Sequence, residues 1–181
     1  GYVNEAFDTD ALTSLPGPSA IGHVRYSTAG ESKLLNAQPI VVDSAHGQFA
    51  IAHNGNLVNA SELRDSLVRE GAIFQTSIDT EVVVHLFARS RETSPEAAII
   101  DAISQVRGAF SFVMMTKDRV VGARDPHGFR PLALGKLDDG WVLSSETCAM
   151  DLIGATYVRD VEAGEVVVIS ESGVRSIKPF A

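Results

Sequence analysis

The pattern of apolar and polar residues along the chain changes its period near Gly108. Before this point, apolar residues recur at helical spacing in three segments: residues 60–70, residues 80–90, and a segment that begins at Pro95. Asn59 as N-cap and Gly71 as a C-terminal stop would bound the first helix. The second segment is apolar nearly all round, which predicts a buried helix, although its run of three valines would also suit a strand.

Residues after Gly108 alternate with a period of two, which is typical of strands. This pattern predicts strands at 109–116, 119–124, 132–136, 141–144, 165–170 and 173–178. A short helix is expected at 146–153, and earlier strands at 20–27, 39–43 and 48–53. The order of strands, then helices, then a strand meander favours an α+β fold with mainly antiparallel sheets over alternating βαβ units.

Composition narrows the classes of function. The chain has 181 residues, of which 45% are hydrophobic, so we expect one domain with a sizeable core. A net charge of −8 without a Lys/Arg cluster argues against a nucleic-acid partner. No apolar run is long enough to span a membrane and no signal peptide shows, so we expect no membrane partner and a cytoplasmic setting.

The sequence His-Asn-Gly-Asn at residues 53–56 is the clearest candidate site. Asn-Gly is a strong hairpin signal, so these residues could form only a turn. Alternatively, Gly55 lacks a Cβ and would let its N–H approach a ligand closely, with the Asn54 amide as a second donor. Two donors that converge on one point form an oxyanion hole.

Two charged residues are further candidates. Arg25 lies within an expected half-buried strand, where its guanidinium needs either an internal salt bridge or a bound carboxylate. Asp79 precedes an expected helix, which it could cap, or it could accept a hydrogen bond from a substrate ammonium.

Metal and thiol chemistry receive less support from the sequence. The only cysteine, Cys148, excludes an internal disulfide, and a lone cysteine is usually a small buried hydrophobe. No His or Lys stands beside it to activate the thiol. The five histidines lack metal-ligand spacing, and no Walker loop or dinucleotide fingerprint is present, so we expect no cofactor in this chain.

Several separated motifs agree in order and spacing with one known family. They are IGHVRYSTAG, NAQPI, IAHNGNLVNASELR, FQTSIDTEVVVHLFARS, GAFSFVMMT, RDPHGFRPLALG and SSETCAMDLIGATYVRDVEAGE. Together they resemble the glutaminase domain of glutamine phosphoribosylpyrophosphate amidotransferases and, more distantly, other class II glutamine amidotransferases. That family consists of N-terminal-nucleophile hydrolases with an αββα sandwich, so the resemblance implies this fold for residues 1–181.

The resemblance also implies roles for individual residues. Asn54 and Gly55 match the family's oxyanion hole. Arg25 matches the residue that holds the glutamine α-carboxylate, and Asp79 matches the one that holds the α-ammonium. The two charged residues would therefore hold a zwitterion by its two ends, and the two donors would stabilise negative charge at its side-chain amide.

Tyr26 and Thr28 lie in the same glutamine-pocket loop of the family. In that family the site hydrolyses glutamine to glutamate and ammonia through a cysteinyl thioester. A phosphoribosyltransferase domain then adds the ammonia to phosphoribosylpyrophosphate, which gives 5-phosphoribosylamine in the first committed step of de novo purine biosynthesis. Glutamine and that second domain are the partners that the resemblance implies.

The sequence departs from the family pattern at its start. The family nucleophile is a cysteine at the mature N-terminus, whereas this sequence begins with Gly1. We therefore expect an N-terminally truncated domain that lacks its opening strands, exposes sheet edges and is inactive as it stands. No phosphoribosyltransferase motif follows, so that domain is expected to be absent from the chain.

In one branch of the family the cysteine that matches Cys148 ligates a [4Fe–4S] cluster. Such a cluster needs four thiolates and one is present, so a cluster, like Mg²⁺, is implied only for the intact enzyme, which we expect to be a homo-oligomer. The alternative is a non-catalytic module, derived from a class II amidotransferase, that binds glutamine or another protein without a nucleophile.

Overall fold

Antiparallel pairing joins all neighbouring strands in the computed structural model, which describes residues 7–24 and 34–180. The larger sheet has the order β1 (Ile40–Ser44), β2 (Gly47–Leu57), β3 (Gly108–Thr116), β4 (Arg119–Arg124), β8 (Val166–Ser170), β9 (Gly173–Ile177). The smaller sheet has the order β6 (Gly140–Ser144), β5 (Ala133–Leu137), β7 (Thr156–Asp160). The helices are α2 (Thr9–Thr13), η1 (Leu34–Asn36), α3 (Ala60–Arg69), α4 (Thr80–Arg89), α5 (Pro95–Ser104) and α6 (Cys148–Ile153).

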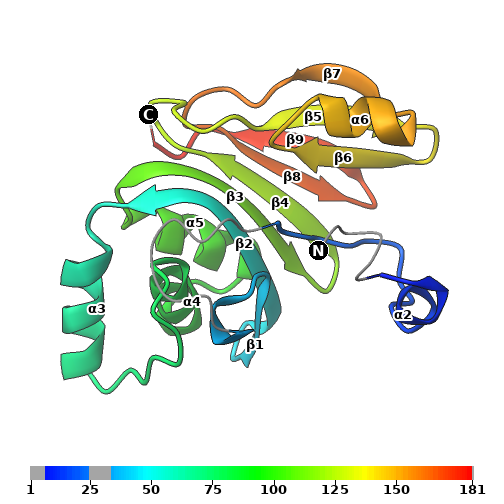
Figure 1. Cartoon of the computed structure of the whole chain (residues 1–181). Helices are drawn as coiled ribbons and strands as arrows, with labels where there is room; N and C mark the ends of the chain where they lie inside the picture. Colours follow the sequence, from blue (N-terminus) through cyan, green and yellow to red (C-terminus); the bar gives the residue numbers. More distant parts are fainter. Residues whose placement is uncertain (1–6, 25–33, 181) are drawn as a thin grey trace.

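The elements stack in four layers (Figure 1). Helices α4 and α5 cover one face of the larger sheet, with α3 beside α4, and the smaller sheet covers the other face. Helix α6 lies on the outer face of the smaller sheet. Each pair of adjacent layers encloses an apolar core. The αββα sandwich expected from the sequence is therefore confirmed.

The central strands of the larger sheet are buried on both faces. In β3, Phe112 packs into the core below the helices, while its neighbour Val113 packs against the smaller sheet. In β8, Val168 and Val167 divide between the two cores in the same way. Successive side chains of a strand point to opposite faces, so one apolar run supplies two cores.

Most of the expected elements are present, and two of the helix ends have the expected causes. Helix α5 begins where Ser94 Oγ accepts a hydrogen bond from Ala97 N at 3.2 Å. Helix α3 is followed by Gly71 with φ 91°, where Ala72 N donates to Leu67 O at 2.9 Å. The buried second segment is helix α4, so the strand alternative for its three valines is wrong.

Some local predictions differ from the structure. Asn59 precedes α3 without capping it, because its side chain bonds Gln105 O and Arg107 N instead. Residues 20–24 form neither helix nor strand, and the rest of the strand expected at 20–27 lies outside the described residues. The pattern also gives no sign of β7, whose side chains are mostly exposed and therefore show no apolar alternation.

A fully buried aspartate and the arginine before it organise the loop that follows β4. The Asp125 carboxylate accepts hydrogen bonds from four backbone N–H groups: those of Phe110, His127, Phe129 and Arg130. The Arg124 guanidinium donates to three backbone carbonyl oxygens: those of Gly128, Arg130 and Val161. The two side chains thus bind donors and acceptors of this loop and connect it to β3 through Phe110 and to the segment after β7 through Val161.

A second buried carboxylate joins the ends of β7, β8 and β9. Glu165 is 1% exposed and its two oxygens receive both terminal nitrogens of Arg159, at 2.6 and 2.8 Å. Ser176 Oγ and Glu162 N also donate to it. Burial by itself would raise the pKa of Glu165, but the hydrogen bonds from Arg159, Ser176 and Glu162 N outweigh burial and lower the pKa to about 2.

This pKa predicts a pH-dependent contribution to stability. Because the folded value lies below the ordinary 4.5, the contribution is fully present above pH 4.5 and is lost as the pH falls toward 2. Glu165→Gln removes the ionised carboxylate, so its melting temperature should lie well below that of the unsubstituted protein at pH 7. Thermal unfolding should show this difference shrinking steadily below pH 4.5. Glu171→Gln, in an exposed turn, is the control; a gap for Glu165→Gln that does not change with pH would contradict the expectation.

Candidate functional site

His-Asn-Gly-Asn lies inside strand β2 and is not a turn. Strand β2 continues to Leu57, and Asn54 and Gly55 pair with Ser111 and Phe110 of β3. The turn hypothesis for residues 53–56 is therefore wrong. The functional interpretation stays open, because the strand still presents successive side chains and amides at the end of the sheet.

Gly55 occupies a position that no other residue fits. Its φ is 150°, and a Cβ there would lie 2.0 Å from Ala109 O and 2.8 Å from His53 Nε2. Gly108, on the paired strand, has the same problem, since its Cβ would lie 2.2 Å from Asn56 O. The backbones of β2 and β3 approach so closely here that only glycine is accommodated.

Asn54 has a side chain that can still take a ligand. It is half-buried on the face of β2 opposite to His53, which points toward the helices. Within the described part of the chain, its amide makes no hydrogen bond. Asn54 thus offers two N–H donors at a partly covered surface.

Asp79 connects helix α4 to the same end of β2. Its backbone is helical and its side chain makes no capping hydrogen bond, so the capping hypothesis is wrong. Instead, Asp79 Oδ2 accepts a hydrogen bond from Leu57 N at 2.8 Å, and Oδ1 lies 3.5 Å from His53 Nδ1. The carboxylate is 24% exposed, so one side of it remains open.

Burial of Asp79 by itself would raise its pKa, but the hydrogen bond and charge of His53 and the N–H groups of Leu57 and Thr80 have the greater combined effect. They lower the pKa below 3.8. The carboxylate is consequently ionised at neutral pH and can accept a hydrogen bond from a cation.

Side-chain hydrogen bonds join three of the sequence motifs into one cluster. Asn36, from the NAQPI motif, bonds Ser77 through Nδ2 and Oδ1. Gln38 Oε1 accepts from His53 N at 2.7 Å. The third connection is the hydrogen bond from Leu57 N to Asp79 Oδ2. Together these bonds fix segments that are far apart in sequence around the end of β2.

The loop before Asp79 is braced from two helices. Glu81 Oε2 of α4 accepts from both the N–H and the hydroxyl of Thr76. Arg64 of α3 donates to Thr76 O and Ile78 O, and its guanidinium lies 3.9 Å from the ring centre of Phe74. The backbone that leads to Asp79 therefore has both donors and acceptors bound.

Three of the predicted site residues, Arg25, Tyr26 and Thr28, lie outside the described residues. Sequence reasoning also missed residues of the cluster, namely Asn36, Gln38, His53, Thr80 and Gly108. A signal for His53 exists, because it occupies a core-facing position in the alternation of β2. The contacts of Asn36 and Gln38 reach across the fold and leave no local pattern.

Cys148 is exposed at the start of α6, so the expectation of a buried hydrophobe is wrong. It is the only cysteine of the sequence, and the described residues hold no group of three or more His, Cys, Asp and Glu side chains that could bind a metal ion. These residues alone do not fit a [4Fe–4S] cluster, which needs four thiolates.

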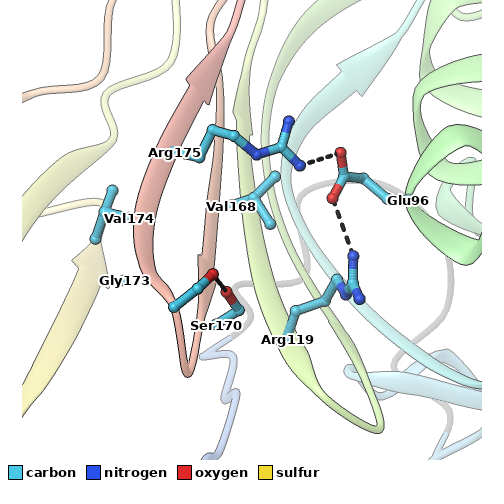
Figure 2. Close-up of a pocket in the computed structure, with 8 residues that line it drawn as sticks. Glu96, Arg119, Val168, Ser170, Gly173, Val174 and Arg175 are labelled. Atoms are coloured by element: carbon cyan, nitrogen blue, oxygen red, sulfur yellow. Dashed lines mark hydrogen bonds and ion pairs between the residues drawn. The ribbon is translucent and has the colours of Figure 1, made fainter.

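A polar pocket of about 410 Å³ lies elsewhere, where β4, β8 and β9 meet the start of α5 (Figure 2). Glu96 bonds Arg119 Nη1 at 3.0 Å and Arg175 Nη2 at 2.5 Å across it. Both guanidinium groups are thus already ion-paired, Arg175 with Glu96 and Arg119 with Glu96 and Asp118. The cluster at the end of β2 is the better candidate for chemistry, because its donors and its carboxylate have open sides.

Residues 23–151 match the family described as "Glutamine amidotransferase domain". The match covers more than half of the chain and includes the cluster around β2. The chain therefore belongs to the glutamine amidotransferase domain family, and the resemblance noted in the sequence is confirmed.

Within this family the chain is similar to amidophosphoribosyltransferases. It is 52% identical over 176 residues to amidophosphoribosyltransferase 2, chloroplastic, of Arabidopsis thaliana, covering 97% of this chain and 31% of that protein. It is 46% identical over 177 residues to the amidophosphoribosyltransferase of Bacillus subtilis, covering 97% and 37%. The chain thus spans about a third of the length of these relatives.

Solved structures agree with this relationship. The B. subtilis glutamine phosphoribosylpyrophosphate amidotransferase, complexed with ADP and GMP, superposes with a TM-score of 0.81 at 45% identity, over 87% of this chain and 34% of that chain. A structure described as the allosteric regulatory enzyme of purine biosynthesis gives 0.83 at 46% identity, with the same coverage. Fold and sequence therefore lead to the same group of enzymes.

Proposed function

We propose that this chain is the glutamine-hydrolysing part of an amidophosphoribosyltransferase and that its substrate is glutamine. The observation that carries the proposal is the 2.8 Å hydrogen bond from Leu57 N to Asp79 Oδ2. It fixes an ionised carboxylate at Leu57, two residues along the strand from Gly55 and three from Asn54. One end of β2 then has a carboxylate that can bind a cation and two neutral N–H donors, those of Asn54 and Gly55. This arrangement suits a substrate with an ammonium at one end and an amide at the other.

In this proposal each group has one task. Asp79 accepts hydrogen bonds from the α-ammonium of glutamine, and Arg25 pairs with its α-carboxylate. When a thiolate attacks the side-chain amide, the carbonyl oxygen becomes negatively charged. Asn54 Nδ2–H and Gly55 N–H donate to that oxygen, and such donors act on the transition state more than on the substrate.

Cys148 is not proposed as the nucleophile. It begins α6, on the outer face of the smaller sheet, whereas Asn54 and Gly55 belong to the larger sheet (Figure 1). The family resemblance instead assigns this role to a cysteine at a mature N-terminus, whose α-amino group would act as general base.

The proposal extends to the whole protein. We propose that the ammonia is consumed by a phosphoribosyltransferase domain, as the names of the relatives suggest, in a homo-oligomeric enzyme. Among the described residues, no helix is long and apolar enough to cross a membrane. The plant relatives carry "chloroplastic" in their names, so the cytoplasmic setting stays a prediction. The alternative of a non-catalytic module has no specific observation in its favour.

Asp79→Asn, in the protein at its natural length, tests the proposal. The asparagine oxygen can still accept from Leu57 N, but the charge that binds the ammonium is lost. A charged hydrogen bond contributes roughly 1.5–3 kcal/mol, so kcat/KM for glutamine should fall by about 10–100-fold. Ammonia release at varied glutamine concentration measures this.

Asp151→Asn, exposed on α6, is the matched control and should leave kcat/KM unchanged. An Asp79→Asn protein with normal kinetics would refute the glutamine site. Binding of glutamine without any hydrolysis by the unsubstituted protein would favour the non-catalytic module instead.

A further inference from the structure

Two buried polar side chains behind Asp79 have no role in the chemistry proposed above. Thr80 has no exposed surface, and its Oγ1 lies 3.4 Å from Asp79 Oδ1 and 3.0 Å from His53 Nδ1. His53 is 5% exposed, and its Nδ1 is 3.5 Å from the same Asp79 oxygen. Polar groups are costly to bury, so a buried pair directed at one carboxylate oxygen calls for an explanation.

The contacts set the direction of the hydrogen bonds. The Thr80 hydroxyl donates to Asp79 Oδ1, so its oxygen is left to accept from His53 Nδ1–H. Nε2, the other ring nitrogen, takes no part in these contacts. That atom is buried, has no hydrogen-bond partner within the described residues, and faces Gly55, where a Cβ would lie 2.8 Å away. One imidazole therefore contacts both the Asp79 side and the Gly55 side of the cluster.

We infer that Thr80 and His53 are positioning residues that make the site selective for an amide substrate with an α-ammonium group. The inference rests on the proposed glutamine site and deepens it. Leu57 N contacts Asp79 Oδ2, while Thr80 and His53 contact Oδ1, so these groups oppose rotation of the carboxylate about its χ2 bond. Its open side keeps one direction, and a rigid acceptor loses no further rotational freedom when an ammonium binds.

Removing the contacts of Thr80 and His53 with Asp79 should lower kcat/KM only for substrates that have the ammonium. Glutamine carries it, whereas 4-carbamoylbutanoate is the same amide without the α-amino group. The discriminating quantity is the ratio of kcat/KM for glutamine to kcat/KM for 4-carbamoylbutanoate, because a general loss of catalytic power cancels from it.

The experiment compares Thr80→Val with Thr80→Ser in the protein at its natural length. Valine has the shape of threonine without the hydroxyl, and the ratio should fall by about 10-fold, since a hydrogen bond to a charged group is lost. Serine retains the hydroxyl and should retain the ratio. Thr116→Val, which removes another buried threonine hydroxyl at the opposite end of β3, should not change it.

A second pair of variants tests His53 independently of the fold around Thr80. Asparagine places an amide N–H close to the position of Nδ1, whereas leucine has no donor. His53→Asn should therefore keep a higher ratio than His53→Leu, with thermal unfolding as a check that both proteins are folded.

The outcomes are separable. If Thr80→Val lowers kcat/KM equally for both amides, or if His53→Asn and His53→Leu give one ratio, the selective role is refuted and the residues are only structural. If Thr80→Val does not fold, the His53 pair decides. If the unsubstituted protein hydrolyses neither amide, the proposed function itself fails.

Discussion

Replacing Asn54 by alanine is expected to lower kcat for glutamine hydrolysis by about 10²–10³-fold, because one of the two donors to the developing oxyanion is removed. The fold should survive, since the Asn54 side chain is half-buried and makes no hydrogen bond within the described part of the chain. Such a site typically costs less than about 0.5 kcal/mol of unfolding free energy when truncated. Steady-state ammonia release and thermal unfolding of the same preparation separate the two effects.

A second asparagine of the same strand, Asn56, serves as the control. Asn56 lies two residues further along β2, carries the same amide and is exposed. Asn56→Ala should retain kcat and stability. An Asn54→Ala protein that keeps its kcat, or a loss of the same size in both variants, would remove Asn54 from the proposed oxyanion hole.

Asp125→Ala should produce the largest loss of stability of the substitutions considered. It leaves four backbone N–H groups without their acceptor, three in the loop after β4 and one in β3, at a residue with no exposed surface. Breaking a buried charged network typically costs about 3–5 kcal/mol. For a chain of this length, that corresponds to a fall in melting temperature of roughly 10 °C.

Chemical denaturation measured beside thermal unfolding tests this magnitude. Asp139→Ala, in the exposed turn between β5 and β6, should change the unfolding free energy by less than about 0.5 kcal/mol. Asp125→Asn should fall between the two, because its oxygen can accept while its amide faces donors. A loss below about 1 kcal/mol for Asp125→Ala would mean that water replaces the carboxylate in the loop.

The elements that the sequence predicts are those with local causes. Alternation of apolar residues marks β3, β4, β5, β6, β8 and β9, and Ser94-Pro95 marks the start of α5, because a strand's burial and a helix cap depend on adjacent residues. Strand β7 escapes prediction since its pairing with β5 is not matched by burial of its side chains. Asn59 has the composition of a cap, but long-range partners in another segment take its side chain.

The site residues show the same difference between local and long-range causes. Asn-Gly favours a hairpin when both residues can adopt positive φ, but here only Gly55 does so, and the paired strand β3 extends β2 through the motif. Asp79 is misread as a cap because its true partner, Leu57 N, is 22 residues earlier in the chain. The residue types were recognisable from the sequence; their hydrogen-bond partners depend on tertiary contacts that no local pattern encodes.

The division of β3 and β8 between two cores has a consequence for how the chain can vary in length. Adding or deleting one residue within either strand would exchange the inward and outward sets, so that Phe112 would be directed at the smaller sheet and Val113 at the helices. Neither core has the shape for the other set. Changes in length are therefore expected in connections such as the exposed turn at Asp138 and Asp139, while the central strands keep a fixed number of residues.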